Sequence, residues 1–358
     1  MLQELFETWD GEMVATRYER DAGVWMFVCV HSTQLGPGTG GTRMKSYASP
    51  YDALRDGMRL SGAMTLKFAV VGLPLGGGKA VIAIPEIPQG DERVALMRRY
   101  GEFVGSLGGT YRTAPDMNTS ERDMDIVGDV CGYAFCRSPE RGGSGNTAPA
   151  TATGVFHAVR ASLAHATGSD DLGDRIVTVQ GAGAVGARLA ELLVAAGARV
   201  RVADVDQTRA EAAASASGAV AVPSDDVLHE ECDVFAPCAI GGVLDERSIP
   251  RLRCRVVAGA ANNQLATPAD ARRLHEAGIL WAPDFVANAG GVLHGGGFEV
   301  LGWGPEEVER SLEGIGDTLR DVFERAERDG VTTLDAAERL AHERLAAASA
   351  SAGRGPSA

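Results

Sequence analysis

Long apolar runs, which membrane spans and export signals require, are missing from this sequence. No apolar run reaches the roughly 18 residues that a helix needs to cross a bilayer. The first residues, MLQELFETWDGEM, lack the basic region and the apolar stretch of a secretory signal. We therefore expect neither a span nor a signal, and a cytoplasmic location.

Positive charge is scarce relative to negative charge. The 34 Lys and Arg residues compare with 48 Asp and Glu residues, which gives a formal net charge of −14. An acidic surface repels the phosphates of nucleic acids and of anionic lipids. Nucleic acids and membranes are therefore poor candidates as partners.

Cysteine and histidine form none of the common metal-binding motifs. The six cysteines are scattered without a C-x-x-C pair, and the seven histidines form no H-E-x-x-H. Cysteines in apolar surroundings, such as Cys29 between Val28 and Val30, are typical of reduced core thiols in a cytosolic protein. The sequence therefore indicates no metal site.

Lysine is nearly missing, because only Lys45, Lys67 and Lys79 occur among the 34 basic residues. Arginine stays protonated, whereas a buried lysine can lose its proton and act as a base. Lys45 has polar neighbours in the sequence, Arg43 and Ser46, and is interpreted as a surface residue. Lys67 and Lys79 have apolar and glycine neighbours, and two partly desolvated ammonium groups lower each other's pKa. We therefore interpret one as a base and the other as a site for an anion.

The length of 358 residues favours two domains. In the first part we predict a strand at 23–31, a glycine-rich turn at 36–41 and helices at 50–64 and 91–107. The polar, glycine-rich stretch RSPERGGSGNT at 137–147 is suited to a hinge. Beyond it, strands and helices alternate, which indicates an α/β fold with a parallel sheet and crossover helices.

The motif Gly181-x-Gly183-x-x-Gly186 predicts a dinucleotide site. It follows a predicted strand at 175–180 and opens a helix at 184–196. The glycines permit a tight turn and close approach of the pyrophosphate to the helix N-terminus. Asp204 ends the next predicted strand, where it would accept hydrogen bonds from the ribose and repel a 2′-phosphate. The cofactor is therefore predicted to be NAD. The alternative is a glycine-rich turn in an unrelated α/β protein.

Asp116 follows Pro115 in the cluster TAPDMNT. Taken alone, an aspartate in this setting is more typical of a helix N-cap or a turn than of a catalytic site.

Several stretches of the chain resemble the glutamate/leucine/phenylalanine/valine dehydrogenase family. They occur in the family's order and spacing between about residues 30 and 300. The matching stretches are Gly40–Arg43, Met64–Lys67, Gly76–Lys79, Pro115–Asn118, Gly181–Gly186, Ala236–Ala239, Gly259–Asn263 and Asn288–Gly291. Within the family, Pro115–Asn118 and Glu299–Trp303 resemble most the phenylalanine dehydrogenases of actinobacteria.

The resemblance implies an NAD-dependent oxidative deamination that yields a 2-oxo acid and ammonium. Lys67 would bind the substrate carboxylate, with Asn262 and the backbone near Gly40 and Gly41. Lys79 would activate the water that attacks the imino carbon, and Asp116 would exchange protons with the amino group. The implied cofactor-binding residues are Thr147, Thr151, Gly181, Gly183, Ala184, Val185, Gly186, Asp204, Cys238, Ala239, Ala260 and Asn262.

The resemblance also places a side-chain pocket, lined by Thr39, Met64, Ala114, Val292 and Gly295. Small residues leave room for a bulky apolar substrate such as phenylalanine, and no lysine lies near Thr39 to neutralise a glutamate side chain. Two departures from the family pattern bear on this pocket: Ala114 replaces a glycine, and His294–Gly297 replaces bulkier residues. A branched-chain substrate is the alternative, and a catalytically silent NAD-binding regulator is a remote one.

The resemblance implies the following organisation. A substrate-binding and oligomerisation domain spans 1–140, with C-terminal helices from about 310–350 packing back on it. A Rossmann-type, doubly wound NAD-binding domain spans 145–305. Residues 351–358 are expected to be disordered. A homo-oligomer built through the N-terminal domain is expected.

Overall fold

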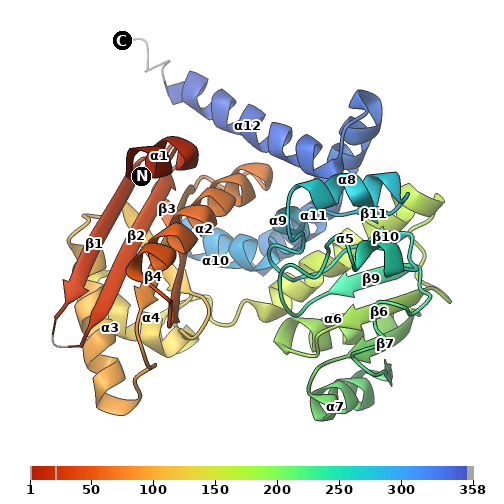
Figure 1. Ribbon diagram of the computed structural model, residues 1–358, viewed down its shortest axis with the longest axis horizontal. Helices are drawn as coiled ribbons and strands as arrows, with labels where there is room; N and C mark the ends of the chain where they lie inside the picture. Colours follow the sequence, from red (N-terminus) through yellow and green to blue (C-terminus); the bar gives the residue numbers. More distant parts are fainter. Residues whose placement is uncertain (1, 21, 353–358) are drawn as a thin grey trace. The chain divides into compact units, whose positions relative to one another are not determined.

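The computed structural model describes residues 2–20 and 22–352 and divides the chain into two compact units (Figure 1). The first unit contains the chain up to Asn146, Gly295–Gly302 and the chain from Ala341. The second contains Thr147–His294 and Trp303–Leu340. Of the predicted disordered tail, residues 351 and 352 end a helix, and 353–358 lie outside the described residues.

The first unit is built on a five-stranded mixed sheet of order β1-β2-β4-β3-β5. Strands β1 and β2 are antiparallel, as are β2 and β4, whereas β3 is parallel to β4 and β5. The predicted strand at 23–31 is β2, whose β-branched and aromatic residues are almost all buried. The strands are β1 (Met13–Glu19), β2 (Val24–Ser32), β3 (Gly38–Lys45), β4 (Gly76–Ala83) and β5 (Tyr111–Pro115).

The prediction of a glycine-rich turn over 36–41 is wrong for most of its length. Gly38–Gly41 belong to strand β3, which pairs with β4 and β5. A Cβ at Gly40 would overlap the carbonyl oxygen of Gly78 on β4. These glycines therefore permit close packing of strands, a use of glycine that composition does not distinguish from a turn.

Four helices accompany this sheet: α1 (Leu2–Trp9), α2 (Pro50–Val70), α3 (Gly90–Gly105) and α4 (Glu121–Cys131). Helix α2 begins with Pro50 behind Ser49, whose Oγ accepts a hydrogen bond from Asp52 N at 3.2 Å. It extends six residues beyond the predicted end at 64, so that Lys67 lies on a helix.

The second unit is a parallel six-stranded sheet of order β11-β10-β9-β6-β7-β8, as the alternating pattern predicted. The strands are β6 (Ile176–Gln180), β7 (Arg199–Ala203), β8 (Val220–Ala221), β9 (Val234–Pro237), β10 (Val256–Val257) and β11 (Leu280–Trp281). The helices are α5 (Ala148–Thr167), α6 (Ala184–Ala195), α7 (Gln207–Ser217), α8 (Ala269–Glu276), α9 (Asp284–Ala287), α10 (Gly290–Val300), α11 (Pro305–Asp329) and α12 (Thr333–Ala352). Two of the four divisions between the units fall within α10 and α12. The two-domain α/β fold with a Rossmann-type sheet is confirmed.

The helices from about 310–350 are predicted to pack back on the N-terminal domain, and the structure assigns α11 to the second unit. This helix packs against α5 within the second unit. Its apolar stripe, including Leu312, Ile315 and Leu319, is buried. A Cβ at Gly154 of α5 would lie 2.6 Å from Ile315 Cδ1, so glycine allows the two helices to approach closely. Only the part of α12 from Ala341 belongs to the first unit.

Two of the scattered cysteines meet in the second unit. Glu231 bridges Arg253 and Val234 pairs with Val256, so the same register places Cys232 opposite Cys254. The two thiols act on each other, which lowers the pKa of Cys232 and raises that of Cys254. All six cysteines lie within the described residues and are free thiols.

We expect Leu319→Ala to lower the free energy of unfolding by about 2–5 kcal/mol, because it leaves a cavity in the packed face of α11. Urea denaturation measures this loss. Glu324→Ala, an exposed position of the same helix, is the control and should change stability by less than about 0.5 kcal/mol. Equal effects of the two substitutions would contradict the packing of α11 on α5.

Candidate active site

An ion pair with little exposure to solvent joins strand β4 to the residue after strand β5 in the first unit. Lys79 on β4 and Asp116, directly after β5, approach to 3.1 Å between Nζ and Oδ1. The Lys79 residue is only 5% exposed. Asp116 is not the N-cap of the following helix, because Ser120 caps α4. Its backbone does form the expected turn, in which Asp116 N donates to Thr119 Oγ1 at 2.9 Å. The turn and the ion pair therefore coexist at one residue.

Sequence reasoning missed the second cation at this pair. Arg43 on β3 donates from Nε to Asp116 Oδ2 at 2.9 Å and from Nη1 to Asp56 Oδ2 at 3.1 Å. Tyr47 also donates to Asp56 Oδ2, at 2.8 Å. The available signal was the place of Arg43 in the stretch Gly40–Arg43, but Arg43 is one of 31 arginines in the chain, so its residue type did not set it apart.

These charges shift the pKa values of both partners. Burial lowers the pKa of Lys79, and Arg43 lowers it further, whereas Asp116 opposes the shift. Burial would raise the pKa of Asp116, but the charges of Lys79 and Arg43 outweigh it and lower this pKa to about 2. Asp116 is therefore a carboxylate at neutral pH. Lys79 gives up its proton more readily than an exposed lysine.

Lys67 lies in the last turn of α2, a helix that packs against β4. It is buried, with 9% of the residue exposed. Arg43 is a cation that lowers the pKa of Lys79. A mutual effect of the two lysines on their pKa values stays a prediction.

The predicted substrate-binding residues divide between the units. Thr39, Gly40 and Gly41 lie on β3, Met64 on α2, Ala114 on β5 and Gly295 on α10, all in the first unit. Asn262 and Val292 belong to the second unit. A Cβ at Gly41 would lie 2.7 Å from the Pro115 carbonyl oxygen and 2.8 Å from Asp116 Cβ. Glycine at position 41 therefore leaves the space that Asp116 occupies.

A buried hydrogen-bonded group supports this end of the sheet. Tyr100 Oη lies 2.6 Å from Thr42 Oγ1 and 2.9 Å from Thr113 Oγ1. It joins α3 to β3, which carries Arg43, and to β5, which Asp116 follows. Burial raises the pKa of Tyr100 to about 12, so its hydroxyl stays protonated.

The glycine motif of the second unit has the shape expected for a dinucleotide site. Gly181 has φ of +104°, and a Cβ at Gly186 would overlap the Gly181 carbonyl oxygen. Gly183 caps α6 without a side-chain hydrogen bond, and a Cβ there would meet nothing within 4 Å. Ala184 and Val185 open the helix. A helix N-terminus without a side-chain cap, with open space beside Gly183, is an arrangement that a pyrophosphate can occupy.

The other predicted cofactor residues lie in the same unit. Asp204 follows β7 and accepts a hydrogen bond from Ala182 N at 2.8 Å. Cys238 and Ala239 follow β9, and Ala260 and Asn262 follow β10. Asn288 Nδ2 donates to Ala260 O at 3.0 Å and to Asn262 Oδ1 at 2.8 Å. The carboxyl ends of these strands are where ligands bind in parallel α/β sheets.

Thr147 and Thr151 come together with the start of α10. Thr147 is the N-cap of α5, and Thr151 Oγ1 donates to Thr147 O at 3.0 Å. A Cβ at Gly291 would lie 2.8 Å from Thr151 Oγ1. The structure therefore brings these threonines close to Val292, which follows Gly291.

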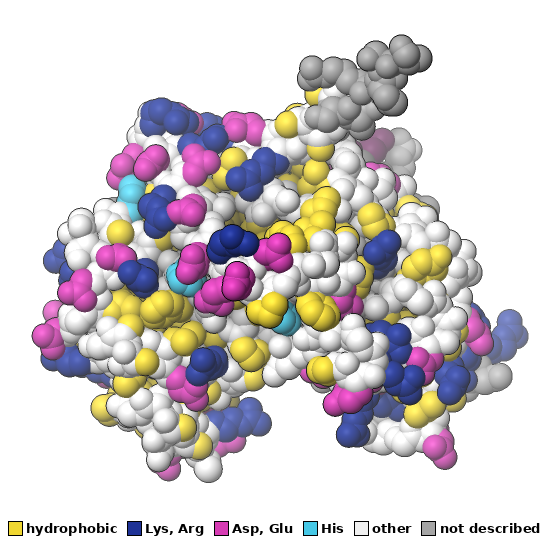
Figure 2. Space-filling model, turned by 180° about the vertical axis from the view of Figure 1, so that it is seen from behind, with side chains coloured by type: hydrophobic (Ala, Val, Ile, Leu, Met, Phe, Trp, Pro, Cys, Tyr) yellow, Lys and Arg dark blue, Asp and Glu magenta, His cyan; other side chains and the backbone are white. Residues whose placement is uncertain are grey.

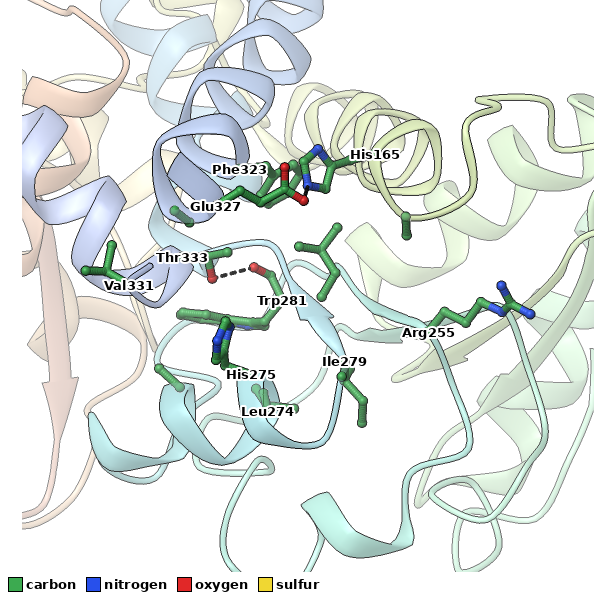
Figure 3. Close-up of a pocket in the computed structure, with 15 residues that line it drawn as sticks. His165, Arg255, Leu274, His275, Ile279, Trp281, Phe323, Glu327, Val331 and Thr333 are labelled. Carbon is green, nitrogen blue, oxygen red and sulfur yellow. Dashed lines mark hydrogen bonds and ion pairs between the residues drawn. The ribbon is translucent and has the colours of Figure 1, made fainter. Parts of the chain in front are cut away.

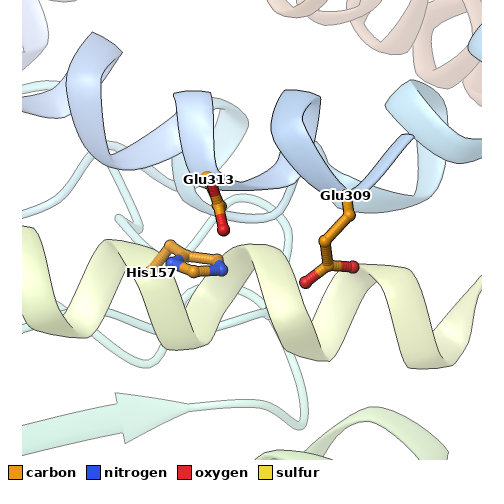
Figure 4. A group of neighbouring side chains, drawn as sticks. All are labelled: His157, Glu309 and Glu313. Atoms are coloured by element: carbon orange, nitrogen blue, oxygen red, sulfur yellow. The ribbon is translucent and has the colours of Figure 1, made fainter. Parts of the chain in front are cut away.

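Two other features of the second unit involve none of the predicted site residues. A cavity of about 500 Å³ lies among α5, α8, β11 and α11, where His165, Trp281, Phe323 and Glu327 line it (Figure 3). On the opposed faces of α5 and α11, His157, Glu309 and Glu313 place ligand atoms within 4.8 Å of one another (Figure 4). Both glutamates are exposed, and carboxylates in such positions are common without a metal.

On the face shown in Figure 2, Asp and Glu side chains lie among Lys and Arg side chains. Among the described residues, no helix is long and apolar enough to cross a membrane.

Comparisons with known proteins cover nearly the whole chain. The model "Glu/Leu/Phe/Val dehydrogenase, dimerisation domain" matches residues 13–132. The model "Glutamate/Leucine/Phenylalanine/Valine dehydrogenase" matches residues 142–210 and 201–353. Leucine dehydrogenase of Geobacillus stearothermophilus is 42% identical over 345 residues, covering 96% of this chain and 93% of the relative.

Two further proteins are similar over almost their full length. Valine dehydrogenase of Streptomyces albus is 41% identical over 356 residues, covering 98% of this chain and 97% of the relative. The crystal structure of L-tryptophan dehydrogenase from Nostoc punctiforme has a TM-score of 0.83 at 35% identity, covering 97% of this chain and 99% of that one. The chain therefore belongs to the glutamate/leucine/phenylalanine/valine dehydrogenase family, NAD(P)-dependent oxidoreductases that act on the CH–NH2 group of amino acids.

Proposed function

We propose that this enzyme catalyses the reversible, NAD-dependent oxidative deamination of a bulky apolar L-amino acid to its 2-oxo acid and ammonium. The buried Lys79–Asp116 pair is the observation that carries the proposal. A lysine with a lowered pKa beside a permanent carboxylate is suited to proton transfer near neutral pH.

The three ionisable residues of the first unit have different proposed roles, which depend on their charge states. Lys67 binds the substrate carboxylate as a cation, with backbone near Gly40 and Gly41. Neutral Lys79 removes a proton from the water that attacks the imino carbon. Asp116 is ionised and therefore accepts a hydrogen bond from the substrate ammonium. Its proposed exchange of protons with the amino group follows from the family resemblance.

The residues of the second unit hold the cofactor. NAD, when bound, supplies the hydride acceptor for oxidation of the substrate Cα. The backbone around Gly181, Gly183 and Gly186 binds the pyrophosphate at the N-terminus of α6, helped by Ala184 and Val185. Asp204 accepts hydrogen bonds from the ribose, and its charge disfavours a 2′-phosphate. Thr147, Thr151, Cys238, Ala239, Ala260 and Asn262 complete the proposed cofactor contacts.

The proposed side-chain pocket favours a phenylalanine-like substrate over glutamate. Thr39, Ala114 and Gly295 are small, and Met64 is a flexible apolar neighbour. The run at His294–Gly297 is helical in α10, and a Cβ at Gly295 would lie 3.0 Å from Cys136 Sγ. The leucine and valine dehydrogenases among the relatives support a branched-chain substrate as the second candidate.

We further propose a cytoplasmic homo-oligomer built through the first unit. The family model that covers residues 13–132 is described as a dimerisation domain, which supports this assignment.

The substrate proposal is tested by steady-state formation of NADH at 340 nm with phenylalanine, tryptophan, leucine, valine and glutamate, each with NAD and with NADP. We expect the highest kcat/KM with phenylalanine and NAD. Preference for leucine or valine would establish the second candidate, and preference for glutamate would contradict the pocket. Intact NAD binding without turnover of any amino acid would instead support a silent regulator.

Replacement of Lys67 and of Lys79 by arginine should affect kcat and KM differently. Lys79→Arg is expected to abolish turnover, because arginine cannot give up its proton. Lys67→Arg keeps a cation for the carboxylate and is expected mainly to raise KM. Steady-state kinetics of both variants check this. A near-normal kcat for Lys79→Arg would show that Lys79 is not the base.

Gly183→Val should separate cofactor binding from folding. A side chain there meets open space and the backbone is extended, so the melting temperature should stay within about 2 °C of the parent. The dissociation constant for NADH, measured by fluorescence titration, should rise at least about tenfold. Gly186→Val, whose side chain overlaps backbone, should lower the melting temperature as well. Unchanged NADH binding by Gly183→Val would contradict the proposed site.

A further inference from the structure

Behind the Lys79–Asp116 pair lies a second ion pair to which no role has been assigned. Arg43 bridges Asp116 and Asp56 through different nitrogens, Nε at 2.9 Å and Nη1 at 3.1 Å. The side chains of Arg43 and Asp56 are 14% and 16% exposed. The four charges therefore form a chain in the order Asp56, Arg43, Asp116, Lys79. These residues lie on α2, on β3, directly after β5 and on β4 respectively.

Asp56 is held as an anion by its other neighbours. Burial would raise its pKa, but the hydroxyl of Tyr47 and the charges of Arg43 and Arg59 lower it. Tyr47 donates to Oδ2 at 2.8 Å, and Arg59 Nη2 lies 3.0 Å from Oδ1. Burial and Asp56 both raise the pKa of Tyr47, so Tyr47 remains a donor.

Arginine is the residue type that this geometry requires. A planar guanidinium presents several N–H donors in fixed directions, whereas an ammonium is a single point of charge. Arg43 uses two of these donors for two separate carboxylates. Its bond to Asp116 Oδ2 leaves Oδ1 for Lys79, so the orientation of the Asp116 carboxylate follows from Arg43.

We propose that Arg43 and Asp56 form a positioning pair that orients the Asp116 carboxylate toward Lys79 and sets the charge balance of the catalytic pair. This inference rests on the proposed role of Lys79 as the base. Arg43 adds a positive charge beside Lys79 and favours its neutral form. Asp56 offsets part of that charge from the far side. Removal of Arg43 and removal of Asp56 must therefore act on Lys79 in opposite directions.

The charged and titratable groups around this pair come from five places in the fold. Strand β3 supplies Arg43, and the segment after it supplies Tyr47, over whose ring Lys45 lies at 4.5 Å. Helix α2 supplies Asp56 and Arg59, strand β4 supplies Lys79, and the turn after β5 supplies Asp116. Of these, Asp116, Arg43 and Asp56 act directly on the pKa of Lys79.

The scarcity of lysine allows a direct measurement. Protein labelled with [ε-13C]lysine contains only three labelled side chains, and the signal lost in Lys79→Arg identifies Lys79. We expect Arg43→Gln to raise the pKa of Lys79 by about one pH unit, and Asp56→Asn to lower it by a similar amount. Arg43→Lys should leave this pKa closer to that of the parent but lower kcat, because one ammonium cannot bridge both carboxylates.

Arg175→Gln serves as the matched control. Arg175 forms a partly buried pair with Asp233 in the second unit, at 3.2 Å between Nη1 and Oδ1. It should leave the Lys79 signal and the pH dependence of kcat/KM unchanged. In the parent enzyme kcat/KM should rise as the pH rises through the pKa of Lys79. This rise of kcat/KM should shift to higher pH in Arg43→Gln and to lower pH in Asp56→Asn.

The outcomes separate this inference from the proposed function. Shifts of the Lys79 signal in one common direction, or no larger than in Arg175→Gln, would overturn the positioning pair even if Lys79→Arg is inactive. Turnover by Lys79→Arg would overturn the assignment of the base, whereas opposite shifts of the signal would still establish the charge coupling.

Discussion

The first unit is organised around the burial of a charged pair. A lysine and an aspartate removed from water each lose solvation, and their mutual attraction compensates only when further hydrogen bonds satisfy the remaining atoms. Arg43 supplies that hydrogen bond to Asp116, and Asp56, with Tyr47 and Arg59, balances Arg43 in turn. The ion pair that we propose to be catalytic is therefore the end of a longer network. Its stability and its reactivity depend on the same contacts.

Glycine makes this network sterically feasible. The central strands β3 and β4 approach so closely that a Cβ at Gly40 would overlap the Gly78 carbonyl, and one at Gly41 would press on Asp116. Side chains at these positions would force apart the strands that carry Arg43 and Lys79. In the second unit, Gly181 and Gly186 likewise permit close approach of the backbone, where helix, strand and turn meet. In both units, the backbone approaches closely at the positions where we propose that a ligand binds.

The family assignment and the charge network answer different questions about the enzyme. Relatives named as leucine, valine and tryptophan dehydrogenases share the reaction class but differ in substrate. We propose that the Lys79–Asp116–Arg43 group serves the proton transfer common to all such substrates. Thr39, Met64, Ala114 and Gly295 are proposed to contact only the substrate side chain. The likeness to phenylalanine dehydrogenases therefore stays a prediction about the pocket, independent of the chemistry.

Local sequence patterns were sufficient to predict the parallel sheet and the helix that begins at the glycine motif. They also singled out Lys67 and Lys79 as candidate site residues. In each case the signal lies within a few residues of sequence. The sheet follows from apolar periodicity, the helix from the glycine spacing, and the lysines from a rare residue type with apolar neighbours. Tertiary structure alone showed that Gly38–Gly41 form a strand, that α11 packs on α5 and that Cys232 meets Cys254. It also showed that Arg43 is the cation beside Lys79. Those features join residues distant in the chain, and their energies depend on burial and direction, which no local pattern encodes.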